Sequence, residues 1–475
     1  MPMSRKVAEE MLPRLRQRYI GRGREGRQRM IDEICEQWGY SRKHAIKLLG
    51  AQAGWGSVVE REDGSRGRSA WELIDAPLLV EGCARRGKFP EAPLETTMTP
   101  KLPTSQDALL FTPGPLTTSL AVKQAMLHDA GSWHWEFNTL VAEVRQAILG
   151  LGGVSRESGW EAILMQGSGT FGVEAVFQSA IPPEGKVAVL SNGAYGERMI
   201  LMLQHARIAH TILRTAEDTP PTPEALDALL ASDPAITHVA AVHCETTTGI
   251  LNPIETLGPV AKRHGKVYIV DAMSSFGGYP IDLEAAGIDF IISSANKCVE
   301  SVPGFSFVLC RRAVLLATEG WARSLSLNLL DQLKGFEKNG QFRYTPPTHS
   351  ILAFAQALKE LELEGGIAAR AARYQANNAA LIAAMQGIGL KSYLPAAVQS
   401  HIITSFVYPK DSAFVWTEFY RLVAEKGFLL YPGKISQADT FRIGNIGRLF
   451  EKDMRAVVNA IAETLREMGV QAGRA

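Results

Sequence analysis

Six short apolar runs recur between residues 162 and 310, and stretches of helical character separate several of them. Each run has five to seven residues and is apolar almost throughout. The runs are AILMQ (162–166), KVAVLS (186–191), THVAAVH (237–243), KVYIVDA (266–272), FIISS (290–294) and FSFVLC (305–310). Strands that are apolar on both faces and alternate with helices form a mostly parallel sheet with helices on both sides. The sequence therefore predicts an α/β fold built around such a sheet.

The chain of 475 residues is long enough for two or three domains, and its composition changes along its length. We expect a basic helical appendage at 1–50, a poorly ordered linker at 51–104, a large domain at 105–347 and a small domain at 348–475. The linker is rich in Gly, Ser, Arg and Pro and matches no regular element. Beyond residue 347 a long helical stretch precedes two or three short strands and a last helix, which predicts a small α+β domain.

Residues 1–50 differ from the rest in charge, with 12 Lys or Arg against 6 Asp or Glu, in a chain of formal net charge +1. Met30, Ile31 and Ile34 fall on one helical face, a glycine ends that helix, and a second, basic helix follows. Two short helices joined by a tight turn are typical of a helix-turn-helix, and the segment resembles the N-terminal part of some transposases. A solvated basic appendage, or a gene-fusion or start-site artefact, explains the same residues, and we prefer this interpretation. Nucleic-acid contact is expected, if at all, from this segment only.

The composition predicts a protein of the reducing cytoplasm. Apolar residues make up 46% of the chain and charged residues 21%, but no run of 18 apolar residues predicts a membrane span. The N-terminus has no apolar core followed by a cleavage site, so we expect no signal peptide. The five cysteines are scattered and odd in number, which predicts neither a disulfide framework nor a metal site.

Two ionisable residues follow buried strands at positions where their side chains can meet. Lys297 comes after FIISS and before the turn VPGF, and Asp271 ends the strand KVYIVD 26 residues earlier. Ligands of open α/β sheets gather at the carboxyl ends of the strands, where a partly buried lysine can form a Schiff base. A carboxylate there can pair with the pyridinium nitrogen of pyridoxal phosphate (PLP). Alternatively, Lys297 is solvated and Asp271 only caps the following turn.

Three polar segments follow other strands of the same set. Ser168, Gly169 and Thr170 stand between AILMQ and a helix, where backbone N–H groups and hydroxyls can hold a phosphate. Tyr195, in SNGAYGER, can stack on a flat ring, and Thr247 lies among the three hydroxyls of HCETTTG. Each segment alone is also an ordinary turn, so the prediction rests on their joint occurrence and order.

The segments GSGT, SNGAYGER, HCETTTGILNP, VDAMSSFGG, SSANKC and FRIGNIG follow one another along the chain. In this order they resemble the class V aminotransferases of PLP fold type I, and the similarity covers about residues 108–470. The resemblance implies a large domain with a mostly parallel sheet, a small C-terminal α+β domain, PLP as cofactor and a homodimer with shared sites. It does not extend to residues 1–100.

The resemblance also implies roles for individual residues, and no metal is among its requirements. Lys297 would hold PLP covalently, Asp271 would pair with the pyridine nitrogen, and Arg442, in FRIGN, would bind the anionic end of the substrate. The other implied contacts with PLP are the phosphate cradle of Ser168, Gly169 and Thr170, the ring stack of Tyr195, the ring-hydroxyl contact of Thr247 and a phosphate contact across the dimer by Thr345, in RYTPPTH.

Within the class, the long matched stretches resemble the enzymes that exchange an amino group between 2-aminoethylphosphonate and pyruvate. The resemblance therefore implies these substrates, with phosphonoacetaldehyde and alanine as products. Arg442 would serve both a phosphonate and a carboxylate, which its planar donor fork allows. A second cation for the phosphonate is expected among Arg198, Arg323 and Arg343.

Two departures from the class pattern leave the donor open. His134 stands where an acidic residue follows the tryptophan in relatives, and Ser301 stands where a glycine is expected, so the donor could be an analogue. The chain could also be an alanine–glyoxylate or serine–glyoxylate transaminase. A further alternative is a DNA-binding regulator that keeps a PLP domain as a ligand sensor.

Overall fold

The computed structural model of the chain describes residue 31, residues 107–433, residue 435 and residues 437–470. The chain divides into two units after Pro100, and every strand and helix named below lies in the second unit, Lys101–Ala475. The helical appendage and the linker predicted at 1–50 and 51–104 lie outside the described residues, apart from Ile31.

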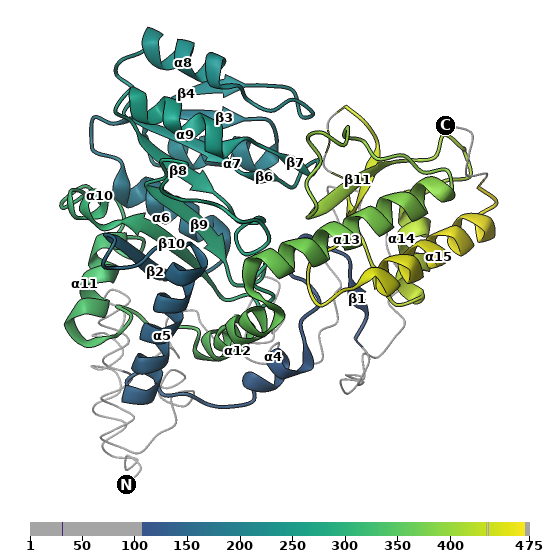
Figure 1. Cartoon of the computed structure of the whole chain (residues 1–475), viewed down its shortest axis with the longest axis horizontal. Coiled ribbons are helices and arrows are strands. Elements are labelled where there is room, and N and C mark those ends of the chain that lie inside the picture. Colours follow the sequence, from purple (N-terminus) through teal and green to yellow (C-terminus); the bar gives the residue numbers. More distant parts are fainter. Residues whose placement is uncertain (1–30, 32–106, 434, 436, 471–475) are drawn as a thin grey trace, which may run out of the picture. The chain divides into compact units, whose positions relative to one another are not determined.

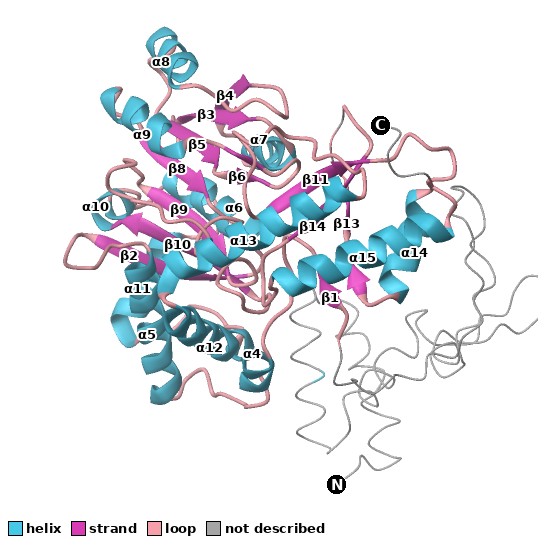
Figure 2. Ribbon diagram, turned by 45° about the vertical axis from the view of Figure 1, so that its right-hand side comes forward, coloured by secondary structure: helices cyan, strands magenta, loops and turns pink. Residues whose placement is uncertain are grey.

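A seven-stranded sheet forms the centre of the large domain (Figures 1 and 2). Its strand order is β2-β10-β9-β8-β5-β3-β4, and only β10 runs antiparallel to its neighbours. The strands are β2 (Trp160–Gln166), β3 (Lys186–Ser191), β4 (Ala209–Arg214), β5 (His238–Val242), β8 (Val267–Asp271), β9 (Phe290–Ser294) and β10 (Phe305–Arg311). Every residue of β5 and β9 is buried, so both faces of these strands are covered. The predicted mostly parallel, doubly covered sheet is confirmed.

Helices pack on this sheet and on one another. Helices α6 and α7 contact each other and the sheet, and so do α8 and α9, while α5 and α11 both contact β2. The helices of this part of the chain are α4 (Leu120–Ala125), α5 (Trp135–Leu151), α6 (Gly169–Ala180), α7 (Ala194–His205), α8 (Pro223–Ser232), α9 (Ile254–Arg263), α10 (Arg312–Leu316), α11 (Leu329–Asn339) and α12 (Thr348–Glu364). One continuous apolar core joins the sheet to these helices, and burial of this apolar surface is the main term that stabilises the domain.

Strand β4, at one edge of the sheet, is the strand that the apolar runs do not predict. Its sequence AHTILR is exposed at both ends and only partly buried between them. An edge strand has a neighbour on one side only and keeps polar residues. Its apolar run is therefore too short and too broken to stand out in the sequence.

The small domain lies at the C-terminal end of the described chain and has its own apolar core. A three-stranded antiparallel sheet is formed by β11 (Ile403–Val407), β14 (Thr440–Gly444) and β13 (Tyr431–Pro432). Three helices accompany it, namely α13 (Gly366–Gly387), α14 (Trp416–Glu425) and α15 (Glu451–Glu467), and α15 packs on both of the others (Figure 2).

A short segment from the start of the described chain completes the small domain. Strand β1 (Leu109–Leu110) pairs in parallel with β12 (Phe428–Leu429), and Phe111 belongs to the apolar core of the small domain. The chain then passes through residues 112–116 before α4, so this stretch connects the small domain to the large one. In the large domain, β5 is followed along the chain by an antiparallel hairpin of two short strands, β6 (Cys244–Glu245) and β7 (Ile250–Leu251).

Candidate active site

The chain segments that carry the predicted site residues leave the sheet at the carboxyl ends of parallel strands. Asp271 is the last residue of β8 and lies opposite Val242 of β5 and Ile292 of β9. Lys297 follows β9 by three residues. Because neighbouring parallel strands end at the same edge of a sheet, these segments meet there, as ligand sites of open α/β sheets do.

Lys297 is partly buried, and its amino group has a backbone partner. The Nζ atom donates a hydrogen bond of 2.7 Å to the Pro113 carbonyl oxygen. Burial lowers the pKa of Lys297 to about 8, although nearby Asp271 raises it in part and nearby Arg442 lowers it further. The amine is therefore neutral in about a tenth of the molecules at pH 7, far more than an ordinary lysine, and a nucleophilic or proton-accepting lysine needs this neutral form.

Gly114 gives the backbone room beside this lysine. A Cβ atom at Gly114 would lie 2.6 Å from the Asn296 carbonyl oxygen and 2.7 Å from Cδ of Lys297, and φ is +112°. Any other residue would collide with the lysine loop and would also strain the backbone. The sequence reasoning gave Pro113 and Gly114 no role, although a glycine between two prolines was a visible sign of a special turn.

Asp271 is a buried carboxylate with few partners. It is 5% exposed, and its Oδ1 accepts a 2.9 Å hydrogen bond from the Met273 N–H. Burial raises the pKa of Asp271 to about 6, and nearby Glu245 raises it further, while Lys297 and Arg198 lower it in part. No cation forms an ion pair with Asp271 within the described part of the chain. A cationic ligand group would relieve this cost of burial.

A small cavity brings four of the predicted residues together, namely Thr170, Tyr195, Arg198 and Asp271. It is lined by Thr170, Val173, Tyr195, Arg198, Met199, Met202, Asp271 and Met273. The Arg198 guanidinium carbon lies 4.7 Å from the centre of the Tyr195 ring, and its Nη1 donates to the Thr170 hydroxyl at 3.2 Å. Helices α6 and α7 and the end of β8 thus supply one wall each to the same space.

The start of α6 offers donors for an anion. Ser168 stands at the N-cap position and is exposed, but its hydroxyl caps no N–H group of the helix. Within the described residues the N–H groups of Gly169 and Thr170 donate to no acceptor. A Cβ at Gly169 would lie 2.1 Å from Sδ of Met273, so the helix start approaches the loop after Asp271 closely. Such an N-terminus binds phosphate readily.

The three threonines of the ETTTG segment have different environments. The Thr247 hydroxyl is occupied, because it donates to Oε1 of Glu245 at 2.6 Å and accepts from the Ala194 N–H at 2.9 Å. The Thr248 hydroxyl accepts from the Ile250 N–H. Only the Thr246 hydroxyl has no hydrogen-bond partner among the described residues. Sequence reasoning selected Thr247 and missed both Thr246 and Glu245, since spacing alone does not say which side chain turns toward which neighbour.

Arg442 reaches the site from the small domain. It is fully buried on β14, and its Nε and Nη1 donate to the carbonyl oxygens of Pro432 and Thr246. The Nη2 atom has no partner in the described chain. Burial lowers the pKa of Arg442, and nearby Tyr195 raises it only in part. A guanidinium without a carboxylate in a buried place is suited to receive an anionic ligand.

The other predicted cations lie in different surroundings. Arg323 donates to the carbonyl oxygens of Ile181 and Pro182 at the end of α6. Arg343 donates to the Leu325 carbonyl oxygen and lies 3.6 Å from a carboxylate oxygen of Asp331. Neither lines the cavity beside Asp271, whereas Arg198 does.

Three further predicted positions do not line the cavity beside Asp271. Thr345 is exposed, and its carbonyl oxygen accepts from the Gln166 amide at 3.4 Å, next to the turn that leads into α6. His134 is exposed at the N-cap of α5. Ser301 is 1% exposed, and its hydroxyl has no partner among the described residues.

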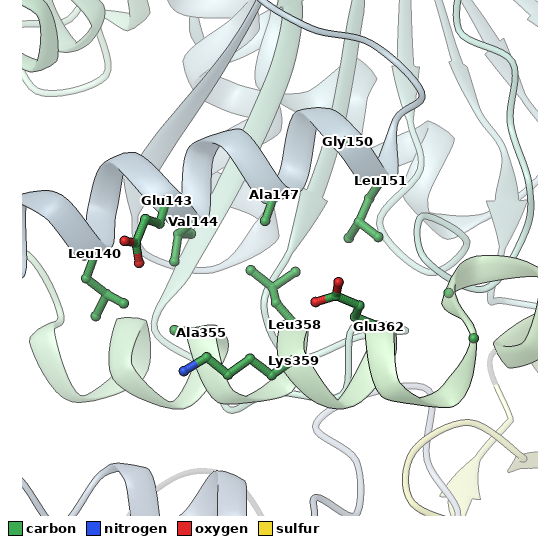
Figure 3. Close-up of a pocket in the computed structure, with 12 residues that line it drawn as sticks. Leu140, Glu143, Val144, Ala147, Gly150, Leu151, Ala355, Leu358, Lys359 and Glu362 are labelled. Carbon is green, nitrogen blue, oxygen red and sulfur yellow. The ribbon is translucent and has the colours of Figure 1, made fainter.

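A second hollow lies between α5 and α12 and takes no part in this site. Figure 3 shows Leu140, Val144 and Leu151 of α5 facing Leu358 of α12, and Glu143, Lys359 and Glu362 also line this hollow. None of the predicted site residues lines it.

In the described residues no three His, Cys, Asp or Glu side chains are grouped as metal ligands would be. None of the described helices combines the length and apolarity of a membrane span.

Comparison with known proteins identifies relatives over most of the chain. The aminotransferase class-V family model matches residues 119–434. The 2-aminoethylphosphonate–pyruvate transaminase of Salmonella typhimurium is 51% identical over 360 residues, which are 75% of this chain and 98% of the relative. The protein of the same name from Salmonella heidelberg matches to the same extent.

Solved structures share the fold at low sequence identity. The alanine–glyoxylate aminotransferase of a Nostoc species superposes with a TM-score of 0.72 at 23% identity and covers 77% of this chain and 97% of its own. The pyridoxamine–pyruvate aminotransferase of Mesorhizobium loti gives a TM-score of 0.69 at 22% identity over 78% and 94%. The predicted fold is confirmed.

The family match begins at residue 119, and nothing in these comparisons supports the transposase-like helix-turn-helix predicted near the N-terminus.

Proposed function

Because the chain belongs to the class V aminotransferase family, we propose that it transfers the amino group of 2-aminoethylphosphonate to pyruvate. The products are phosphonoacetaldehyde and alanine. The observation that carries the choice of substrates is the 51% identity to a transaminase of that name over nearly its whole length. The observation that supports the chemistry is the meeting of Lys297 and Asp271 at one sheet edge, close enough for each to shift the pKa of the other.

The residues of the site fit PLP as the cofactor. Asp271 is a buried carboxylate that lacks a cation among the described residues and would hold the protonated ring nitrogen. The free N–H groups of Gly169 and Thr170, with the exposed Ser168 hydroxyl, would hold the phosphate at the start of α6. Tyr195 would stack on the ring. Thr247 lies in the turn that would face the ring hydroxyl of PLP, and the same turn carries the Thr246 hydroxyl, which has no partner among the described residues.

When bound, PLP supplies an electron sink that makes the proton on the amino-bearing carbon of the substrate removable. Lys297 would hold the cofactor covalently, and its amine would act as the base toward the substrate carbon. With its pKa lowered to about 8 by burial, the Nζ atom can both accept that proton and return it at neutral pH. The Pro113 carbonyl oxygen orients the amine through its 2.7 Å hydrogen bond.

Arg442 binds the anionic end of both substrates. Its unpartnered Nη2 would donate to the carboxylate of pyruvate and to the phosphonate of the amine donor. The phosphonate lies one carbon further from the amine than the carboxylate of alanine does, so a second cation is needed to share its charge. Of Arg198, Arg323 and Arg343, we propose Arg198, since it alone of the three lines the cavity beside Asp271.

The proposed enzyme acts as a homodimer with shared sites. Thr345 is exposed beside the turn that enters α6, a place from which it would reach the phosphate bound in the partner subunit. This proposal rests on the family resemblance of the RYTPPTH segment.

The alternatives have weaker support. An alanine–glyoxylate aminotransferase shares the fold with this chain at only 23% identity, less than half the identity of the phosphonate transaminases. Residues that would bind DNA lie outside the described part of the chain, so the regulator alternative draws nothing from the structure.

A donor and acceptor panel tests the substrates. The purified enzyme with PLP is given 2-aminoethylphosphonate, 3-aminopropylphosphonate, serine or alanine as donor, each with pyruvate or glyoxylate as acceptor. We expect kcat/KM to be highest for 2-aminoethylphosphonate with pyruvate. A higher value for serine or alanine with glyoxylate would contradict the proposal, and a higher value for the longer phosphonate would assign an analogue as donor.

A further inference from the structure

Glu245, the last residue of β6, is a completely buried carboxylate. No Lys, Arg or His side chain forms an ion pair with it in the described part of the chain. Four N–H or O–H groups donate to it instead. Oε1 accepts from the N–H and the hydroxyl of Thr247 at 3.1 and 2.6 Å, and Oε2 accepts from the N–H groups of Tyr195 and Gly196 at 3.0 and 3.3 Å.

The helix that receives these contacts has no cap of its own. Gly193 stands at the N-cap position of α7 and has no side chain, so the first N–H groups of the helix need partners from elsewhere. Thr247 accepts from the N–H of Ala194, and Glu245 accepts from the next two N–H groups. The turn after β5 therefore caps α7 from outside, and a carboxylate is the favoured group at a helix N-terminus.

The fit between Glu245 and α7 is close. A Cβ atom at Gly193 would lie 2.4 Å from Cγ and 2.5 Å from Cδ of Glu245. Only glycine leaves room for the carboxylate at this place. The glycine of the NGAYG segment and the glutamate of the ETTTG segment, 52 residues apart, thus form one contact.

The same turn also contacts the substrate arginine. The carbonyl oxygen of Thr246 accepts from Nη1 of Arg442, one residue after Glu245. On its other side, Glu245 holds the backbone of Tyr195, whose ring lines the cavity with Asp271. The short segment 245–247 is therefore hydrogen-bonded both to the small-domain arginine and to the helix that carries the stacking ring.

We propose that Glu245 is a positioning residue, which fixes the ring of Tyr195 over the cofactor position and the 245–247 turn under Arg442. The inference rests on the proposed PLP-dependent function. Glu245 does not line the cavity beside Asp271, and it acts through Tyr195 and Thr246. Burial raises the pKa of Glu245, and the hydrogen bonds from Thr247, Gly196 and Tyr195 lower it in part.

Glu245→Gln is the decisive variant. The amide keeps the shape of the side chain, but one of its two ends becomes an NH2 group that would face N–H donors or the Thr247 hydroxyl. Glu245→Asp keeps the charge and tests rescue by the conservative change. Glu161→Gln is the matched control, because Glu161 is also a buried carboxylate but forms ion pairs with Arg145 and Arg312. Glu161 lies near the amino end of β2, whereas the site lies at the carboxyl ends of the parallel strands.

The first readout is cofactor binding by the apoprotein. PLP is titrated into each variant, and the visible circular dichroism of the bound cofactor reports the asymmetry of the ring environment. We expect Glu245→Gln to raise the Kd for PLP about 10-fold, as loss of a hydrogen bond to a charged group predicts, and to reduce the visible dichroism at saturation by at least about half. Glu245→Asp should recover part of both losses, and Glu161→Gln should match the wild type in both.

The second readout separates chemistry from stability. At saturating PLP we expect Glu245→Gln to lower kcat about 10-fold and to raise KM for pyruvate, because the ring and the turn under Arg442 are both displaced. If Glu245→Gln does not fold, Gly193→Ala replaces it. That variant places a Cβ atom 2.4 Å from Cγ of Glu245, which must shift the carboxylate, and it should give the same changes at about 3-fold. Gly150→Ala is its control, because a Cβ atom at Gly150 meets nothing within 4 Å.

The outcomes are distinguishable. If the wild type binds no PLP, the proposed function fails. If the wild type binds PLP and Glu245→Gln has the same Kd, dichroism and kcat, the inference about Glu245 is overturned. If Glu245→Gln and Glu161→Gln lose cofactor dichroism equally, Glu245 contributes only to folding, and the inference is overturned in that case too.

Discussion

Two fully buried arginines, Arg370 on α13 and Arg442 on β14, have opposite electrostatic surroundings. Arg370 forms ion pairs with Glu364 at 2.7 Å and with Glu300 at 3.6 Å. Within the described chain, Arg442 donates only to two carbonyl oxygens. Burial alone would lower the pKa of both, but Tyr374, Glu300 and Glu364 raise that of Arg370, whereas that of Arg442 stays lowered.

Each arginine has one nitrogen without a hydrogen-bond partner among the residues that the structure describes, so an unpaired donor does not distinguish the two arginines. The two arginines differ in the carboxylates beside them, because Arg370 forms ion pairs and Arg442 forms none with the described residues. Ion pairs connect α12 and α13 to the loop after Lys297: Arg370 and Arg373 of α13 each pair with Glu364 of α12 and with Glu300 of the loop. Glu300 also accepts a hydrogen bond from the Tyr374 hydroxyl. A buried cation with carboxylates holds structure together, whereas a buried cation without one awaits a ligand anion.

Replacement of Lys297 by methionine should have the largest effect on activity. The variant keeps the volume of the side chain but removes the amine that holds the cofactor and moves the proton. We expect kcat/KM to fall at least about 1,000-fold, in the range of a lost acid–base group. Steady-state kinetics at saturating PLP measures this. Retention of more than a tenth of the activity would remove Lys297 from the mechanism.

Arg442→Met should reduce activity far more than stability. It removes the charge-assisted hydrogen bonds to both substrates, so kcat/KM should fall about 100-fold for 2-aminoethylphosphonate and for pyruvate alike. The carbonyl oxygens of Pro432 and Thr246 lose a donor but no carboxylate is left unpaired, so the free energy of unfolding should fall by only about 1 kcal/mol. Kinetics with each substrate varied in turn, together with urea unfolding, tests both parts.

Arg370→Met should show the opposite pattern, and the pair of variants tests the comparison directly. Glu300 and Glu364 would lose one buried partner, which we expect to cost about 3 kcal/mol of unfolding free energy. Urea unfolding of the cofactor-free proteins measures the difference. A larger loss of stability in Arg442→Met than in Arg370→Met would contradict our distinction between a structural and a ligand-binding arginine.

Lys297 is another buried cation without a carboxylate in an ion pair among the described residues, and the pH dependence of the unfolding free energy tests whether its burial costs stability. Burial lowers its pKa to about 8 from the ordinary 10.5, so the folded protein disfavours the protonated amine. This cost is fully present below pH 8, declines as the pH rises from 8 to 10.5 and is absent above it. Lys297→Met should therefore stabilise the apoprotein by about 3 kcal/mol at pH 7 and by less at pH 10. An equal gain at both values would mean that the amine is not destabilised by burial.

The sequence predicted the fold well because the buried strands are apolar on both faces. All six apolar runs correspond to strands of the sheet, while the half-exposed edge strand β4 was missed. Residues at strand ends could be predicted as well, since Asp271 ends β8 and Lys297 follows β9 by three residues. Their roles in catalysis stay predictions.

Contacts between distant segments could not be predicted. The choice among three threonines depends on side-chain directions in one turn, and the proximity of Gly114 to Lys297 joins positions 183 residues apart. Glu245 was passed over because a single glutamate in a polar segment carries no periodic pattern. Its importance comes from the N-terminus of α7, which lies 50 residues earlier in the chain.

A spectral half-reaction tests the central proposal most directly. The purified protein is saturated with PLP, freed of excess cofactor and given 2-aminoethylphosphonate without pyruvate. We predict that the visible absorbance of the bound cofactor falls with the amine donor and returns when pyruvate is added, and that Lys297→Met never develops the wild-type band. If the band forms but only serine or alanine bleaches it, the family is right and the donor is wrong. A wild-type protein without the band, or a band unchanged in Lys297→Met, would contradict the proposed active site.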